Sequence, residues 1–309
     1  MPPQPLVVDP IDMKKRVIID TDPGLDDALA ILFALGCGQF DVLGLTSVGG
    51  NIGLDRTTKN AGGLLAVMGR DDIPVIAGTD VPLTRELQDI IAIVHGADGL
   101  KGIVLPEPTT EPLTDASGWI AKTLAEAEPG SIDILALGPL TNIAHLLTDY
   151  PEVVDRIGEI IVMGGTINEP GNSGPRSEFN FASDPEAVSV VLGSHAKVTI
   201  IPLDVTRKVR AQIDYVHALP DTTHGRLAKQ LLGQYMQDGT QSRALHDPCV
   251  MLMALDPSIF RIEKLKLDVD LGDEPDAGTL LIDRRGTTVD IAMGVDAPRA
   301  LALLRTGFI

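Results

Sequence analysis

Short apolar segments rich in β-branched residues alternate with segments of helical periodicity, and this alternation constrains the fold more than any other feature. We predict strands at Arg16–Asp20, Asp41–Val48, Pro74–Ala77, Ile132–Leu137, Glu159–Met163 and Lys197–Leu203. We predict helices between them at Leu25–Leu35, Asp55–Met68, Ala116–Glu126, Thr141–Tyr150 and Pro185–Leu192. This order is typical of an α/β fold with an open, mostly parallel, Rossmann-like sheet and helices on both faces.

The C-terminal third of the chain predicts that the sheet is mixed at one edge. Helices are predicted at Gly225–Met236 and Pro248–Ala254, and short strands at Leu265–Leu271, Thr279–Asp283 and Thr288–Ile291. Arg284, Arg285 and Gly286 are typical of a hairpin turn. No linker or repeat interrupts the pattern. We therefore predict one domain over residues 15–309, preceded by an extended tail at residues 1–14.

The chain is strongly acidic, with 25 Lys and Arg against 43 Asp and Glu and a net charge of −18. Such a charge disfavours nucleic acid and anionic membranes as partners and favours a neutral ligand, or one bound through a cation. Solubility alone would also explain it. Cys37 and Cys249 both lie in apolar helical segments, so we expect reduced thiols and a cytoplasmic protein. We expect neither a signal peptide nor a membrane span.

Four carboxylates, those of Asp20, Asp22, Asp26 and Asp27, fall where the first predicted strand ends and the first helix begins. Like charges this close repel one another, and the positive end of a helix offsets only part of the repulsion. A hard divalent cation such as Ca²⁺, which prefers carboxylate oxygens, would offset more. The alternative is a helix cap with solvated charges, but one cap needs only one Asp.

Polar groups also follow other predicted strands. Asn51 ends the segment Val-Gly-Gly-Asn, and the backbone carbonyl of Leu137 opens a turn where it could bind a metal. The long segment Gly164–Phe181 has no regular pattern and carries Asn172, Glu178 and Asn180, which suit a polyhydroxylated ligand. Since strand ends and the loops after them form ligand sites in parallel sheets, we place the site at this edge. Ordinary turns and a polar surface loop remain the alternatives.

Two histidines stand in polar contexts. His246 and Asp247 precede Pro248, a residue typical of the first position of a helix, so Asp247 is either a helix cap or a metal ligand. His246 could act as an acid or base, and His95 is ambiguous. The sequence contains no dinucleotide-binding or P-loop glycine motif, no EF-hand and no serine nucleophile elbow, which disfavours those chemistries.

Together these motifs resemble the inosine–uridine preferring nucleoside hydrolases. The matching segments, in family order, are Asp-Thr-Asp-Pro-Gly-Leu-Asp-Asp, Val-Gly-Gly-Asn, Leu-Gly-Pro-Leu-Thr-Asn, Met-Gly-Gly, Glu-Phe-Asn and His-Asp-Pro. The resemblance implies that Ca²⁺ is bound by Asp22, Asp27, Asp247 and the carbonyl of Leu137. It implies ribose binding by Asp26, Asn51, Asn172, Glu178 and Asn180, with Met163 lining the pocket. His95, His246 and Tyr235 would face the base.

The implied reaction is hydrolysis of the N-glycosidic bond of ribonucleosides through a ribosyl cation. Calcium would hold the ribose hydroxyls and the attacking water, Asp22 would act as the base, and His246 would protonate the leaving base. A homodimer or homotetramer is expected from the same resemblance. Two alternatives remain: a metal-dependent phosphatase of the haloacid dehalogenase type, and a calcium-dependent nucleoside-binding protein without catalytic activity.

Overall fold

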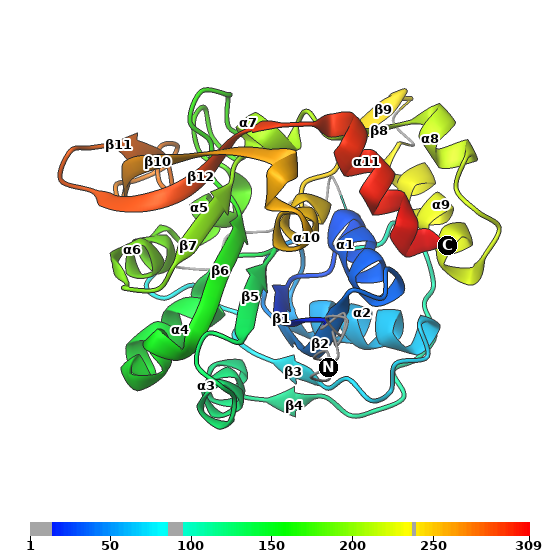
Figure 1. The fold of residues 1–309 in the computed structure, drawn as a ribbon, viewed down its shortest axis with the longest axis horizontal. Helices are drawn as coiled ribbons and strands as arrows, with labels where there is room; N and C mark the ends of the chain where they lie inside the picture. Colours follow the sequence, from blue (N-terminus) through cyan, green and yellow to red (C-terminus); the bar gives the residue numbers. More distant parts are fainter. Residues whose placement is uncertain (1–13, 86–94, 237–238) are drawn as a thin grey trace, which may run out of the picture.

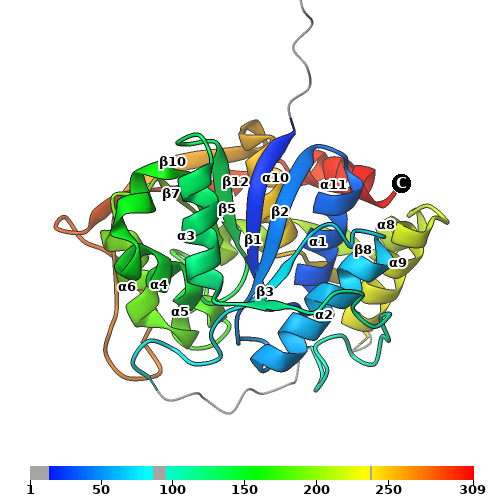
Figure 2. The same ribbon diagram turned by 90° about the horizontal axis from the view of Figure 1, so that it is seen from below.

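A computed structural model describes residues 14–85, 95–236 and 239–309. The described residues form one ten-stranded sheet in the order β11-β10-β12-β7-β6-β5-β1-β2-β3-β4, with helices on both faces (Figures 1 and 2). The predicted α/β class with an open, mostly parallel sheet is therefore confirmed. Residues 1–13 of the expected tail lie outside the described residues.

Seven strands form the parallel part of the sheet, and their pairing brings the carboxyl ends of successive strands to one edge. Their bounds are β1 Lys15–Thr21, β2 Phe40–Ser47, β3 Val75–Ala77, β4 Leu113–Thr114, β5 Ile132–Ala136, β6 Ile157–Met163 and β7 Val198–Ile201. The central strand β1 pairs with β2 on one side and β5 on the other. Residues at the centre of β1, such as Ile18 and Ile19, are fully buried because helices cover both faces.

Each face of the sheet packs against its own apolar core (Figure 1). One core contains α1 Leu25–Gly36, α2 Leu54–Val67, α9 Thr223–Tyr235, α10 Pro248–Leu255 and α11 Ala297–Arg305. The other contains α3 Ala116–Glu126, α4 Thr141–Asp149 and α6 Pro185–Gly193. Helix α1 is buried almost throughout, because it lies between the sheet and α9 and α10. Its N-terminus is therefore held firmly at the carboxyl edge of β1.

The remaining edge of the sheet is antiparallel, as predicted, but one turn differs. Strands β11 Leu280–Ile282 and β12 Thr287–Val295 both pair antiparallel with β10 Phe260–Val269, and β12 also runs parallel to β7. The turn at 283–286 joins β11 to β12, which do not pair with one another, so the predicted hairpin turn is wrong. Strand β10 lies between the other two, and its Leu267 pairs with Ile282 on one side and with Thr287 on the other.

Several short elements carry too weak a pattern to be predicted. They are α5 Phe179–Ser183, α7 Leu203–Thr206, α8 Ile213–His217, β8 Arg210–Gln212, β9 Ser242–Ala244 and the 3₁₀ turns Pro151–Arg156, Pro257–Ile259 and Thr306–Phe308. Helix α5 begins inside the segment expected to be irregular, because Glu178 caps it. The predicted strand Lys197–Leu203 ends at Ile201, since Leu203 already begins α7.

No helix among the described residues is long and apolar enough to cross a membrane. Cys37 and Cys249 are both free thiols, and Cys249 is buried.

Candidate active site

The acidic segment after β1 turns sharply into α1, and Asp27 organises this turn. Its carboxylate accepts hydrogen bonds from the Thr21 hydroxyl at 2.8 Å, the Gly24 backbone amide at 3.0 Å and the Asn51 side-chain amide at 3.2 Å. Asp27 thus caps the start of α1 and is also tied to the segment after β2. One carboxylate satisfies the helix end, so the other acidic residues of the turn are not needed for capping.

The carboxylate of Asp22 is fixed at one oxygen and unpartnered at the other. Its Oδ2 accepts a hydrogen bond from the Asn51 backbone amide at 2.6 Å, whereas its buried Oδ1 has no hydrogen-bond partner. Two glycines make room for it. A Cβ at Gly50 would lie 2.1 Å from Oδ2, and a Cβ at Gly138 would lie 2.5 Å from Oδ1. An unpaired buried carboxylate oxygen is costly, so this oxygen is suited to bind a ligand.

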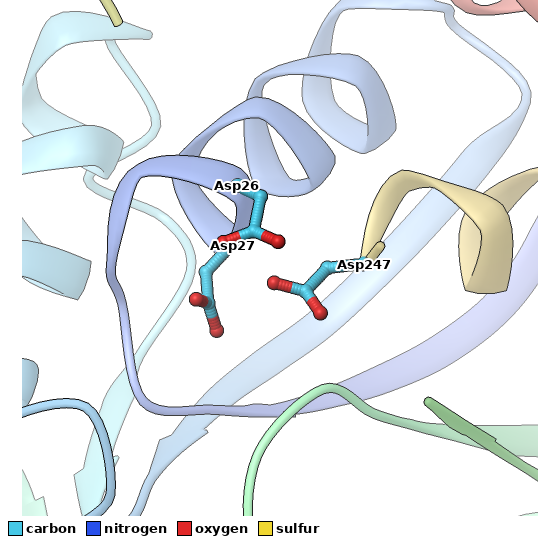
Figure 3. A group of neighbouring side chains, drawn as sticks. All are labelled: Asp26, Asp27 and Asp247. Carbon is cyan, nitrogen blue, oxygen red and sulfur yellow. The ribbon is translucent and has the colours of Figure 1, made fainter. Parts of the chain in front are cut away.

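Carboxylates from opposite ends of the chain meet beside this turn. One oxygen each of Asp26, Asp27 and Asp247 lie within 4.8 Å of one another, and Figure 3 shows the three side chains pointing together from α1 and α10. Asp247 occupies the N-cap position of α10 but makes no capping hydrogen bond. Its carboxylate is therefore available to the site, which favours a ligand role over the capping alternative.

The buried carboxylates are electrostatically strained in the absence of positive charge. Burial, and then the charge of Asp27, raise the pKa of Asp22 well above its usual range and the pKa of Asp26 to about 7. For Asp247, burial and the charges of Asp26, Asp27 and Asp22 raise the pKa. A hard divalent cation would counter both causes of the raised pKa values. It would take the place of the lost water around the buried carboxylates and neutralise their mutual repulsion. The donor set, the unpartnered Asp22 oxygen and the glycine cradle together fit a divalent cation.

The ends of β5 and β6 are joined by one amide side chain. Asn180 Nδ2 donates to the Leu137 carbonyl at 2.7 Å and to the Met163 carbonyl at 3.1 Å. A carbonyl oxygen has two lone pairs, so the Leu137 oxygen can accept this bond and still offer a second site to a metal. Gly138, the residue after Leu137, lies against the Asp22 carboxylate and brings this carbonyl to the site.

Glu178 and Asn172 belong to the same region, but the structure shows them bonded to the backbone. The Glu178 carboxylate accepts hydrogen bonds from the backbone amides of Gly165, Asn180 and Phe181. Burial nevertheless raises its pKa to about 7. The Oδ1 atom of Asn172 accepts from the Phe179 amide at 2.8 Å. The loop before α5 is thus fixed by side chains that were predicted to bind ribose.

The two histidines predicted to face the nucleobase both lie close to Tyr235. His95 Nδ1 accepts a hydrogen bond from the Leu25 backbone amide at 3.0 Å, and its ring centroid is 6.1 Å from that of Tyr235. His246 Nδ1 lies 2.7 Å from the Thr206 hydroxyl. Burial lowers the pKa of each histidine to about 4, so both are neutral at pH 7. A neutral imidazole can still donate or accept one hydrogen bond.

Sequence reasoning missed residues that position the site rather than line it. Asn142 donates to Asp20 Oδ1 at 2.8 Å and to the Ser47 carbonyl at 3.0 Å, and accepts from the Thr79 amide. It therefore ties together the ends of β1, β2 and β3. Its place in the Leu-Gly-Pro-Leu-Thr-Asn segment was the only feature of the sequence that pointed to a role for Asn142 in the site. Thr206, which holds His246, gave no local signal because the contact is long-range.

A buried cluster of carboxylates at the carboxyl edge of a parallel sheet is typical of α/β enzymes with a metal-binding site. A family model described as inosine-uridine preferring nucleoside hydrolase matches residues 17–302. The chain belongs to this family. The predicted family and its class of activity, nucleoside hydrolysis, are thereby confirmed.

Individual relatives match over nearly their whole length. The non-specific ribonucleoside hydrolase RihC of Salmonella paratyphi C is 35% identical over 295 residues, covering 95% of this chain and 94% of that protein. The solved plant nucleoside hydrolase PpNRh1 is 33% identical with a TM-score of 0.90, covering 96% and 99%. A solved purine-preferring ribonucleoside hydrolase from Gardnerella vaginalis is 28% identical with a TM-score of 0.89, covering 95% and 98%.

Proposed function

We propose that this protein hydrolyses the N-glycosidic bond of ribonucleosides to ribose and free base, with a bound calcium ion. The observation that carries the proposal is the meeting of Asp26 and Asp27 with Asp247, within 4.8 Å, at the edge of the sheet where ligands bind. Relatives with non-specific and with purine-preferring activity both match the chain, so the preferred base is left open.

The residues that would hold calcium are Asp22, Asp27, Asp247 and the carbonyl of Leu137. Asp26 shares the same group of oxygens and is assigned to the ribose hydroxyls, although its oxygen also lies within reach of a cation. When bound, calcium would neutralise these carboxylates and orient the 2′- and 3′-hydroxyls and the attacking water. The preference of Ca²⁺ for several carboxylate and carbonyl oxygens supports its choice over zinc.

Asp22 is assigned as the base that takes a proton from the attacking water. Its Oδ2 is held by the Asn51 amide, and its Oδ1 has no hydrogen-bond partner that would compete for a proton or a cation. The surrounding carboxylates and amide oxygens stabilise the positive charge that develops on the ribosyl ring. Asn51, Met163, Asn172, Glu178 and Asn180 shape this ribose site, and several of them do so by fixing backbone segments.

We assign His95, His246 and Tyr235 to the part of the site that contacts the nucleobase. Thr206 fixes one ring nitrogen of His246, so the other is oriented for a single hydrogen bond to the base. Because the pKa of His246 is lowered to about 4, we assign it a neutral hydrogen-bonding role at pH 7 rather than that of an imidazolium acid.

The decisive test is ribose release from inosine, adenosine, uridine and cytidine, with calcium and with a chelator. Calcium-dependent release from at least one of them is expected. Binding of nucleosides without release of reducing sugar would favour a non-catalytic binding protein. Phosphate release from p-nitrophenyl phosphate without ribose release would favour a phosphatase.

Two further assignments belong to the proposal. The free thiols of Cys37 and Cys249 support a cytoplasmic location, since an oxidising compartment favours disulfides. We also propose a homodimer or homotetramer, on the strength of the family, which light scattering on the purified protein would test.

A further inference from the structure

A pocket of about 170 Å³ adjoins the acidic centre and is lined by three arginines, Arg207, Arg210 and Arg243. Tyr235 and His246 form part of the same lining. His246 directly precedes Asp247, so the pocket adjoins the carboxylates at this residue. Three guanidinium groups around one pocket contrast with the net charge of −18 of the chain.

Each arginine is oriented by hydrogen bonds to the pocket lining or to segments next to it, and Arg207 also forms an ion pair with Glu169 at 3.5 Å. Arg243 lies 5.0 Å from the Tyr235 ring centroid and donates from Nε to the Tyr235 carbonyl at 2.5 Å. Arg207 donates to the carbonyls of Pro170 and Gly171, in the segment that leads to Asn172.

Arg210 completes the set by donating twice to Ser242, at 3.0 Å to its hydroxyl and 2.9 Å to its carbonyl. A guanidinium group carries only donors and a permanent positive charge. A pocket with three such groups is therefore suited to an anion or to a ligand that becomes one.

We propose that Arg207, Arg210 and Arg243 stabilise the negative charge that develops on the departing nucleobase. This inference rests on the proposed function, because it places the base on the side of His246 and Tyr235. When the C1′–N bond breaks, its electron pair moves to the ring nitrogen of the base. The oxygen of water bonds to C1′, the proton of that water passes to Asp22, and the free base takes a proton from solvent afterwards.

The arginines act where this charge appears, since donors directed at developing charge lower the barrier more than they strengthen substrate binding. They are thus catalytic residues at the leaving-group end of the substrate, opposite to the carboxylates that stabilise the ribosyl cation. The carboxylates would then stabilise the positive charge on the ribosyl ring, and the arginines would stabilise the negative charge on the departing nucleobase.

The test compares inosine with p-nitrophenyl β-D-ribofuranoside in the calcium-loaded enzyme, for the variants Arg207→Gln, Arg210→Gln and Arg243→Gln. Since p-nitrophenolate leaves without assistance, each variant should lose at least about tenfold in kcat for inosine and less than about twofold for the p-nitrophenyl riboside. Retained activity on the second substrate also shows that the variant is folded. Arg226→Gln, which removes an exposed arginine of α9 paired with Asp221, is the matched control and should leave both rates unchanged.

Equal losses on both substrates, or no loss on either, would overturn the assignment. Inosine 5′-monophosphate provides a further arm: a wild-type kcat/KM higher than that for inosine would show that the arginines bind a phosphate instead. If the wild-type enzyme released ribose from neither nucleosides nor the p-nitrophenyl riboside, the proposed function itself would fail. An active wild type with unaffected variants would overturn only the role of the arginines.

Discussion

One carboxylate oxygen of Asp22 lies 2.6 Å from the backbone amide of Asn51, while the other oxygen is buried without a hydrogen-bond partner. The first contact fixes the orientation of the carboxylate, and the second oxygen lies beside Gly138. In the proposed mechanism, one oxygen would position the side chain and the other would take the proton from water.

Replacing Asp22 tests its assignment as metal ligand and base. In Asp22→Ala, kcat for ribose release should fall by a factor of about a hundred or more, since a general base contributes this much. Asp41→Ala, which removes a half-exposed carboxylate on β2, is the control and should keep its activity. Near-normal ribose release from the Asp22 variant would rule out the role given to it.

The glycine cradle around Asp22 gives a second prediction. In Gly50→Ala, the new Cβ would come within 2.1 Å of Asp22 Oδ2, so the carboxylate must move. Because a displacement of about 1 Å in a catalytic group can cost about a hundredfold in rate, we expect a loss of that order in kcat. Gly193→Ala places its Cβ in open space and is the matched control. Equal activity of the two variants would show that Asp22 needs no cradle.

Metal removal should change thermal stability, because the clustered carboxylates repel one another when no cation is bound. Calcium at about a hundred times its dissociation constant should stabilise the fold by about 2.7 kcal/mol, a rise in Tm of roughly 4 °C for a chain of this length. Asp247→Asn should abolish this rise and increase the Tm in chelator, since its carboxylate makes no capping bond that would be lost. A calcium-dependent rise that survives in Asp247→Asn would place the ion elsewhere.

The raised pKa of Glu178 predicts the pH dependence of stability in the metal-free protein. Between pH 4.5 and about 7 the folded state binds more protons at this group than the unfolded state does, so stability falls as pH rises through this window. The fall is at most about 3 kcal/mol, as each pKa unit is worth about 1.4 kcal/mol.

Denaturant titrations of Glu178→Gln across this pH window would measure that contribution. The variant should be less stable overall, since an amide cannot accept from all three backbone donors, but its stability should fall less between pH 4.5 and 7. Glu126→Gln removes an exposed carboxylate of α3 and should retain the wild-type slope. Identical slopes in the two variants would contradict the assignment.

Thr206 gives a prediction about the part of the site that contacts the nucleobase. In Thr206→Val the ring of His246 loses its 2.7 Å hydrogen bond, and kcat for nucleosides should fall by about tenfold, as for other residues that orient a functional histidine. Thr206→Ser keeps the hydroxyl and should recover most of the activity. If the serine variant were as impaired as the valine variant, the hydroxyl would not be the relevant group.

Local sequence patterns were sufficient for much of the fold. The apolar segments that became β1, β2, β5 and β6 were found because buried parallel strands are continuously apolar. The acidic turn indicated a metal site from its density of carboxylates, whereas the His-Asp-Pro segment left Asp247 as either a helix cap or a ligand. The structure groups Asp27 and Asp247 with Asp26, but not with the predicted ligand Asp22. The place of Asp26 in that group could not be predicted, because it depends on the rotation of α1 about its axis.

The rest of the site depends on contacts between distant segments. The bonds from Asn51 to Asp22 and from Asn180 to Leu137 join the ends of neighbouring strands, and no local pattern encodes them. The pocket formed by Arg207, Arg210 and Arg243 was missed for the same reason, since two of its members lie on or beside strands of only three residues. The turn between β11 and β12 was wrong because short strands carry no information about their partner.

The carboxylates of the site are contributed by α1, near the start of the chain, and by α10, near its end. During synthesis, a ribosome-bound chain that has not yet released α10 lacks Asp247 and cannot complete the ion site, even if β1 and α1 have already formed. Cation binding at the proposed site would therefore require that the chain be synthesised and folded at least as far as α10, so the first strand and helix could not acquire the ion on their own.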